Sequence, residues 1–111
     1  MNDATFLAAI LDAIDEPILV ADTGHIVRPM NKPAIALYDG GTALLGSSLL
    51  DCHNQESQRM ILEILAAMED GEDERTFSDD GEQRIAMRAV RGPDGRLLGY
   101  FERYDPPPQI P

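Results

Sequence analysis

The sequence predicts an α+β domain: a five-stranded antiparallel sheet with helices packed on one face and a further helix at the N-terminus. Two observations predict this class. Short apolar or alternating runs joined by turn residues occur in pairs near both ends of the chain, which is typical of β-hairpins. Between them lies a long stretch with helical periodicity. The length of 111 residues suits one domain with one hydrophobic core.

The first helix is expected from Asp3, a favourable N-cap residue, to about Ile14. Its apolar stripe is wide for so short a helix and comprises Phe6, Leu7, Ile10, Leu11, Ala13 and Ile14. A stripe of this width indicates contact on two sides, with the sheet and with a second subunit; packing against the core alone remains equally compatible. Pro17 ends the helix because proline disfavours a helical conformation in the residue before it.

The first hairpin is expected between residues 18 and 28. Ile18 to Ala21 is a continuous apolar run of β-strand type. Asp22-Thr23-Gly24 is a turn, in which we expect Gly24 to adopt positive φ and Asp22 to bond the turn backbone. Ile26 to Arg28 then returns as the second strand.

The middle of the chain predicts two capped helices. Asn31 caps a short one, with Pro33 in its first turn, and residues 39–41 end it. Residues 42–53 are expected to be irregular, with one helical turn near Leu49-Leu50. Asn54 caps the longest helix, from Gln55 to about Asp70, and Gly71 follows as its C′ residue. One face of this helix is apolar: Met60, Ile61, Ile64, Leu65 and Met68.

The last third predicts three antiparallel strands, at residues 75–78, 83–91 and 97–104, joined by turns at 79–81 and 92–95. The middle strand alternates, with Ile85, Met87 and Ala89 on one face. Residues 106–111 are proline-rich and suit a free end or the start of a linker. We therefore divide the chain into an N-terminal helix (1–15), the main domain (16–105) and this tail.

The composition restricts the classes of partner. The formal net charge of −11 opposes binding to nucleic acid phosphates or to an anionic membrane surface. The single cysteine excludes an internal disulfide. The sequence contains neither an apolar run of bilayer-spanning length nor a basic segment ahead of its first apolar residues. We expect a soluble, cytoplasmic protein.

Three short motifs, in order and at these distances, carry a family resemblance: Asp22-x-Gly24, Asn31-x-x-Ala34 and Leu45-Gly46. Followed by the paired strands, they resemble a PAS domain from about Leu7 to Asp105. The resemblance implies a PAS-like fold and a non-catalytic sensory module that binds a small ligand or partner and relays a conformational change. It also implies a homodimer or contact with a partner signalling domain.

A further stretch is similar to one PAS subgroup, whose signature is Gly-Arg-x-x-x-x-Cys-His-Pro-Pro-x-Ser. The matching residues here run from Gly46 to Ser57 and include Cys52 and His53. Ser47 stands where that subgroup has arginine, and Asn54-Gln55 replaces the two prolines. The motif of the flavin-binding, light-sensing subgroup is not matched by residues 50–55, so flavin is not expected.

Cys52 and His53 are the reactive-looking pair, immediately before the long helix, whose N-terminus favours negative charge. Such a position would favour the thiolate of Cys52, and His53 is a possible ligand for a haem iron or another metal. The favoured interpretation is structural, with Cys52 as a small apolar residue and His53 bonded to the local backbone. Haem therefore stays an alternative, and the cofactor is unknown.

We expect a ligand pocket between the long helix and the sheet. Its predicted lining residues are Met60, Ile64, Met87 and Phe101, with His53 at the mouth, and Cys52 is a further candidate ligand-binding residue. No nucleophile motif or phosphate-binding loop supports an enzyme. Two alternatives stay open: a haem- or metal-binding redox sensor using His53 or Cys52, and a dimerisation module without a ligand that associates through the N-terminal helix.

Overall fold

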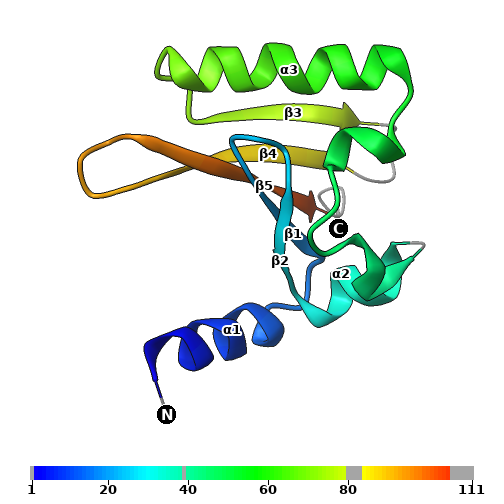
Figure 1. Ribbon diagram of the computed structural model, residues 1–111, viewed down its shortest axis with the longest axis vertical. Coiled ribbons are helices and arrows are strands. Elements are labelled where there is room, and N and C mark those ends of the chain that lie inside the picture. Colours follow the sequence, from blue (N-terminus) through cyan, green and yellow to red (C-terminus); the bar gives the residue numbers. More distant parts are fainter. Residues whose placement is uncertain (1, 39, 80–83, 106–111) are drawn as a thin grey trace, which may run out of the picture.

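A single antiparallel sheet forms the centre of the molecule (Figure 1). The computed structural model describes residues 2–38, 40–79 and 84–105. Within them the sheet has five strands in the order β2-β1-β5-β4-β3. The strands are β1 Ile18–Asp22, β2 Val27–Met30, β3 Glu74–Asp79, β4 Arg84–Arg91 and β5 Leu97–Asp105. The predicted antiparallel sheet is thus confirmed, and the two hairpins meet where β5 pairs with β1.

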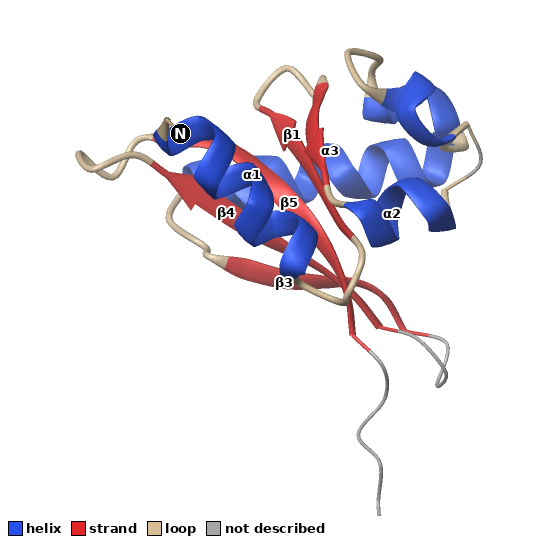
Figure 2. Cartoon of the chain, turned by 90° about the horizontal axis from the view of Figure 1, so that it is seen from below, coloured by secondary structure: helices blue, strands red, loops and turns tan. Residues whose placement is uncertain are grey.

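The helices lie on both faces of this sheet. They are α1 Asp3–Ala13, α2 Lys32–Leu37 and α3 Gln55–Glu69, with short 3-10 helices η1 Gly41–Leu44 and η2 Leu49–Cys52. Figure 2 shows α1 in front of the sheet and α3 behind it. We call the face covered by α3 the inner face and the face toward α1 the outer face. The predicted turn near Leu49 is confirmed as η2, whereas η1 was not expected.

The hydrophobic core lies on the inner face. Its strand residues include Leu19, Ala21, Met87 and Tyr100. From α3 come Ile61, Ile64, Leu65 and Met68, at the helical spacing that the sequence predicts. Met60 lies at the margin of this face and is half-buried.

Asparagines cap all three α-helices. The predicted caps Asn31 and Asn54 are confirmed, each accepting a backbone N–H three residues on. At α1 the cap is Asn2 and not Asp3, because the Asn2 side chain accepts from the backbone of Thr5 at 2.7 Å. Asp3 therefore occupies the first turn, where its charge suits the helix dipole.

Asn31 also joins three elements, and it is fully buried. Its Oδ1 accepts from Ile18 at the start of β1 as well as from Ala34 in α2. Its Nδ2 donates to the carbonyls of Leu11, Ile14 and Glu16, where α1 ends. One side chain thus ties the end of α1 to the sheet and to α2.

The β1–β2 turn differs from the prediction in one residue. Asp22 bonds the turn as expected, accepting from Gly24 at 2.9 Å and from Ile26 at 3.1 Å. The residue with positive φ is His25, at 67°, and not Gly24. This conformation turns the His25 side chain inward, where it is 7% exposed. The expected turn at residues 79–81 and the tail at 106–111 fall wholly or partly outside the described residues.

Candidate functional site

The pleat of β5 decides which of its side chains face the core. Successive strand residues point to opposite faces, and β5 places Tyr100 and Glu102 on the inner face. Glu102 stands opposite Leu19 of β1 and Met87 of β4, both of which are core residues. Phe101 therefore points to the outer face.

This pleat corrects one predicted pocket residue. Met87 and Ile64 lie together in the core, 0% and 2% exposed. Phe101 is on the opposite side of the sheet, so it cannot share a pocket with them. Although Phe101 is apolar, the inward positions of this strand carry a tyrosine and a glutamate. A ligand-binding role for Met60, Ile64 and Met87 stays a prediction.

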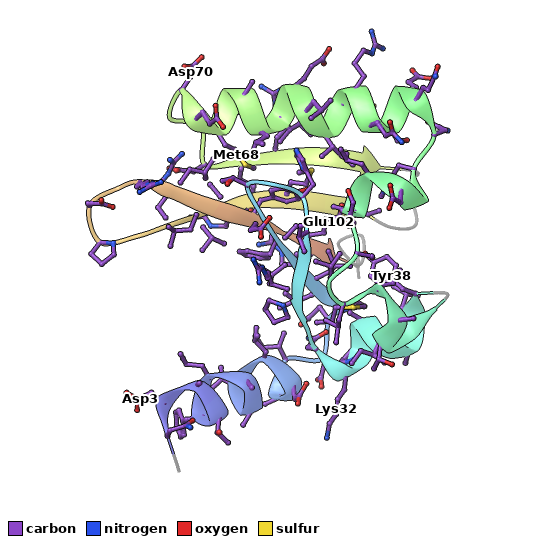
Figure 3. The ribbon with its side chains drawn as sticks, in the orientation of Figure 1. Asp3, Lys32, Tyr38, Met68, Asp70 and Glu102 are labelled. Atoms are coloured by element: carbon purple, nitrogen blue, oxygen red, sulfur yellow. The ribbon has the colours of Figure 1, made fainter. Side chains whose placement is uncertain are left out.

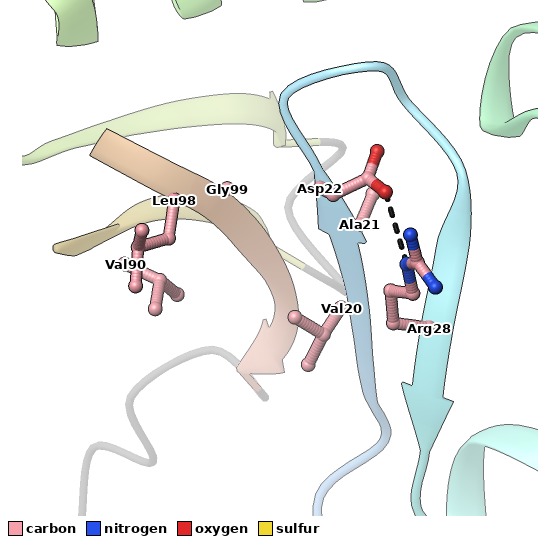
Figure 4. A pocket seen from close by; sticks show the side chains of 7 residues that line it. All are labelled: Val20, Ala21, Asp22, Arg28, Val90, Leu98 and Gly99. Atoms are coloured by element: carbon pink, nitrogen blue, oxygen red, sulfur yellow. Dashed lines mark hydrogen bonds and ion pairs between the residues drawn. The ribbon is translucent and has the colours of Figure 1, made fainter. Parts of the chain in front are cut away.

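Phe101 lines an apolar hollow of about 320 Å³ on the outer face. Its other walls are Leu11 and Ile14 from the end of α1, with Ile18, Val20 and Val90 from the sheet. A smaller hollow of about 130 Å³ continues it past Val20 and Val90 toward Leu98 and Gly99 (Figure 4). Gly99 is required there, because a Cβ at that position would overlap the carbonyl oxygen of Ala21.

A buried carboxylate forms the centre of the inner-face site. Glu102 is only 3% exposed. The hydroxyl of Tyr38, at the C-cap of α2, donates to its Oε2 at 3.2 Å. Figure 3 labels both residues. The other oxygen, Oε1, is buried and has no hydrogen-bond partner within the described part of the chain. An unsatisfied buried acceptor of this kind is costly and needs an explanation.

The surroundings of Glu102 set its protonation. Burial raises the pKa of this carboxyl, because the charged form loses its hydration. The nearby charge of His53 and the Tyr38 hydrogen bond act in the opposite direction and lower the pKa, but burial is the larger effect. Glu102 is therefore held closer to its neutral form than an exposed glutamate.

His53 bonds the local backbone, as the structural interpretation expected. Its Nδ1 lies 2.9 Å from the carbonyl of Leu49, and a carbonyl only accepts, so Nδ1 carries a proton. Gln58 of α3 donates to the carbonyls of Leu50 and His53, which holds η2 against the helix. His53 is half-buried. Cys52 ends η2, and its side chain lies outside what the structure describes.

A second polar pair, which sequence analysis missed, lies two residues away along β5. The ring Nδ1 of His25 and the hydroxyl of Tyr100 are 2.9 Å apart, both side chains being buried. Burial lowers the pKa of His25, while the charge of Asp22 raises it to a smaller extent. The sequence offers only a weak signal for this pair. His25 follows a turn, and its inward orientation depends on a positive φ, which is uncommon for residues other than glycine.

Among residues 2–38, 40–79 and 84–105, no three or more His, Cys, Asp or Glu side chains gather as metal ligands would. Within the same residues, none of the helices is both long and apolar enough to cross a membrane.

The fold is that of PAS domains. A PAS domain from Colwellia psychrerythraea superposes with a TM-score of 0.70 and 16% identity, covering 95% of this chain and 97% of that one. A sensory box sensor histidine kinase from Vibrio cholerae gives 0.63 and 13%, covering 91% and 89%. A C-terminal domain from Streptococcus mutans gives 0.75 and 17%, covering 93% and 84%. At these identities the likeness establishes the α+β PAS fold and assigns no residue a role.

No family model matches the sequence. The search of curated proteins also finds no match.

Proposed function

We propose that this chain is a non-catalytic sensory module that binds a small ligand on the inner face of its sheet. One observation carries the proposal: the buried Glu102 accepts from Tyr38 and lies near His53, and its other oxygen has no hydrogen-bond partner among the residues that the structure describes. Polar groups buried at such cost are more frequent at functional sites than in plain cores. The PAS fold of solved sensor domains supports the same class of function.

The route of the signal follows from the two faces of β5. A ligand at Glu102 would alter the packing of this strand. The preceding residue, Phe101, lines the outer hollow together with Leu11 and Ile14 from the end of α1. Asn31 offers a second connection, because it bonds both β1 and the last carbonyls of α1. A ligand that prefers one arrangement by a few kcal/mol is enough to shift such an equilibrium.

A small-molecule screen followed by backbone amide NMR tests this function. Binders are first found by thermal shift and then titrated into isotope-labelled protein. The expected perturbations lie at Tyr38, at His53 and along residues 100–102, with smaller ones at the end of α1. Binders that perturb only the outer face, or a screen without binders, would contradict the proposal.

An absorption spectrum distinguishes the haem- or metal-binding alternative from a sensor of a colourless ligand. Because Leu49 engages Nδ1 of His53, an iron would have to use Nε2. A band near 400 nm in freshly purified protein, lost in His53→Ala and kept in a His25 variant, would establish this alternative. A blank spectrum from 300 to 700 nm leaves the colourless-ligand sensor.

A dimerisation module is the second candidate, and the exposure of α1 favours it. None of the residues of this fully described helix is buried, and Phe6, Leu7 and Ile10 are 55%, 61% and 45% exposed. Apolar side chains grouped on one helix are typical of association surfaces. Sedimentation should show a dimer that becomes monomeric when residues 1–14 are deleted; a dimer that survives the deletion would exclude α1 as the interface.

We also infer that the module works in a cytoplasmic signalling pathway through another protein and not through nucleic acid or a membrane. The net charge of −11 supports this choice, because like charge repels phosphate surfaces.

A further inference from the structure

We propose that the hollow on the outer face binds a single-chain carboxylate, with the apolar tail against the end of α1 and the carboxylate head on the guanidinium of Arg28. The inference goes beyond the proposed function, because it assigns a second ligand site on the opposite face of the sheet. Two observations carry it: an apolar hollow that continues along the sheet, and an arginine that lines its continuation.

The larger part of the hollow suits an apolar tail, because every side chain that lines it is apolar. Leu11 and Ile14 form one wall, and the other walls belong to β1, β4 and β5. All of these side chains except Ile18 are only half-buried, so they leave apolar surface in contact with water. A ligand chain that covers this surface removes it from water, which is the main driving force for binding in apolar pockets.

The hollow is elongated and has polar groups only in its smaller part. Val20 and Val90 line both the larger part, of about 320 Å³, and the smaller part, of about 130 Å³. The smaller part is also lined by Leu98 and by the ion pair of Asp22 and Arg28, which Figure 4 shows beside Val20. A linear chain with one polar group at its end fits this arrangement.

Arg28 selects the head group. Its side chain is 66% exposed, and its Nε–H donates to Oδ2 of Asp22 at 2.9 Å. Within the described residues, its Nη1 and Nη2 groups make no hydrogen bond. A guanidinium offers five N–H donors in a planar fork that matches a carboxylate. A ligand carboxylate can therefore bind the Nη groups of Arg28 while Asp22 keeps the Nε–H.

The charges at this end favour an anionic head over a cationic one. Both oxygens of Asp22 already accept hydrogen bonds, Oδ1 from Gly24 and Ile26 and Oδ2 from Arg28. An ammonium head would have to compete with Arg28 for this carboxylate. The net charge of −11 opposes an anion at long range, but physiological salt screens that repulsion beyond about 8 Å, and contact with Arg28 is shorter.

An NMR titration with saturated carboxylates from hexanoate to dodecanoate, each below its micelle-forming concentration, tests the inference. The shifted amides should include Val20, Val90 and the end of α1, while those of Tyr38, His53 and α3 stay unchanged. Each added methylene should tighten binding by up to about fourfold until the hollow is filled. Each carboxylate should bind about two- to fivefold more tightly than the matched n-alcohol. Failure of every carboxylate to bind, or shifts centred on α3, would overturn the proposal.

Two variants test the tail and the head separately. Val90→Phe places a larger side chain where the two parts of the hollow meet, so it should weaken decanoate and decanol alike, at least tenfold. Val20→Phe, at the same junction, replaces this variant if it does not fold. Arg28→Gln should abolish the preference for decanoate and leave decanol binding unchanged.

The matched control is Arg59→Gln, which makes the same change of charge on the exposed side of α3 and should affect neither ligand. Equal affinities in wild type, Val90→Phe and Arg28→Gln would show adsorption elsewhere, such as on the exposed Phe6 and Leu7, and would overturn the proposal.

A second copy of the chain is the competing occupant of the hollow, and sedimentation at the concentrations of the titration detects it. A dimer that binds no carboxylate and that Val90→Asp dissociates would assign the hollow to a subunit interface and overturn the proposal. The inner-face site is tested independently, because its ligand should shift Tyr38 and His53. Carboxylate binding in the hollow, with no binder on the inner face, would support this inference and refute the proposed function.

Discussion

The two faces of β5 differ in chemistry although their residues are neighbours in sequence. On the inner face, Tyr100 and Glu102 are 0% and 3% exposed and each is held by a directed hydrogen bond. On the outer face, Phe101 borders an apolar hollow that α1 covers only at its end. The comparison teaches that the inner face holds its polar groups by directional hydrogen bonds, while the outer face offers non-directional apolar contact.

The largest expected effect is on stability, and it separates the two faces. Met87→Ala removes a fully buried core side chain, so the free energy of unfolding should fall by about 2–5 kcal/mol. Val90→Ala, on the outer face of the same strand, removes a half-buried side chain and should cost about 1 kcal/mol or less. Urea unfolding of both variants measures the difference, and equal losses would contradict the assignment of faces.

Asn31→Ala should have the next largest effect. The change removes the α2 cap and leaves the buried N–H of Ile18 and three carbonyls at the end of α1 without this partner. We expect the free energy of unfolding to fall by about 2–4 kcal/mol. Loss of the cap accounts for about 1 kcal/mol, and at least one buried polar group left without a partner accounts for the rest. Asn54→Ala, which removes a cap alone, is the control and should lose about 1 kcal/mol in the same unfolding assay.

The pH dependence of stability should reveal Glu102. Its pKa is raised above the ordinary 4.5, so the folded state binds more protons than the unfolded state between these two values. Stability therefore falls as pH rises from about 4.5 through the folded-state pKa, and the loss is complete above it. Glu102→Gln, which resembles the protonated acid, should match wild type at low pH and become the more stable protein toward neutral pH. A stability difference between wild type and Glu102→Gln that does not change with pH would contradict this assignment.

His25 should act in the opposite direction, in a pH window whose upper end is its ordinary pKa of 6.5. Its pKa is lowered from the ordinary 6.5, so the unfolded state binds more protons below that value. The contribution of His25 is fully present above about 6.5 and is lost as pH falls through 6.5 toward the folded-state pKa. His25→Asn, which tolerates the left-handed backbone, should lose this slope in urea unfolding between pH 5 and 7.5. Retention of the full slope in the variant would assign it to another group.

The smallest effect is expected at the exposed side of α1. Phe6 is 55% exposed, so Phe6→Ser should change the stability of the monomer by no more than about 0.5 kcal/mol. Unfolding at a protein concentration low enough to exclude association measures this value. A loss near that of Met87→Ala would show that α1 packs more closely on the sheet than the exposed fractions indicate.

Most of the fold could be predicted because local patterns and tertiary packing agree. Asn31 and Asn54 cap helices in isolation for the same reason as in the folded chain, and Ile61, Ile64, Leu65 and Met68 repeat at the period of a helix that covers a sheet. These features need only neighbouring residues, so the sequence contains them directly.

The site could be predicted only in part, because the residues of β5 do not reveal which of its side chains point toward the core. Both alternating sets contain apolar and charged side chains: Phe101 with Arg103, and Tyr100 with Glu102. The rule that apolar residues point inward then selects Phe101 wrongly. Pairing with β1 and β4 decides the question, and it brings Tyr38, which is 64 residues from Glu102 in sequence, to the carboxylate.

The most direct test of the account is a carboxyl-carbon NMR titration of Glu102, with the backbone amides of residues 11–16 recorded at each pH. The account predicts that Glu102 titrates above 4.5 and that these amides, at the end of α1, shift with the same midpoint. A Glu102 that titrates at or below 4.5, or amides that do not follow it, would contradict a sensing site on the inner face that is coupled to α1.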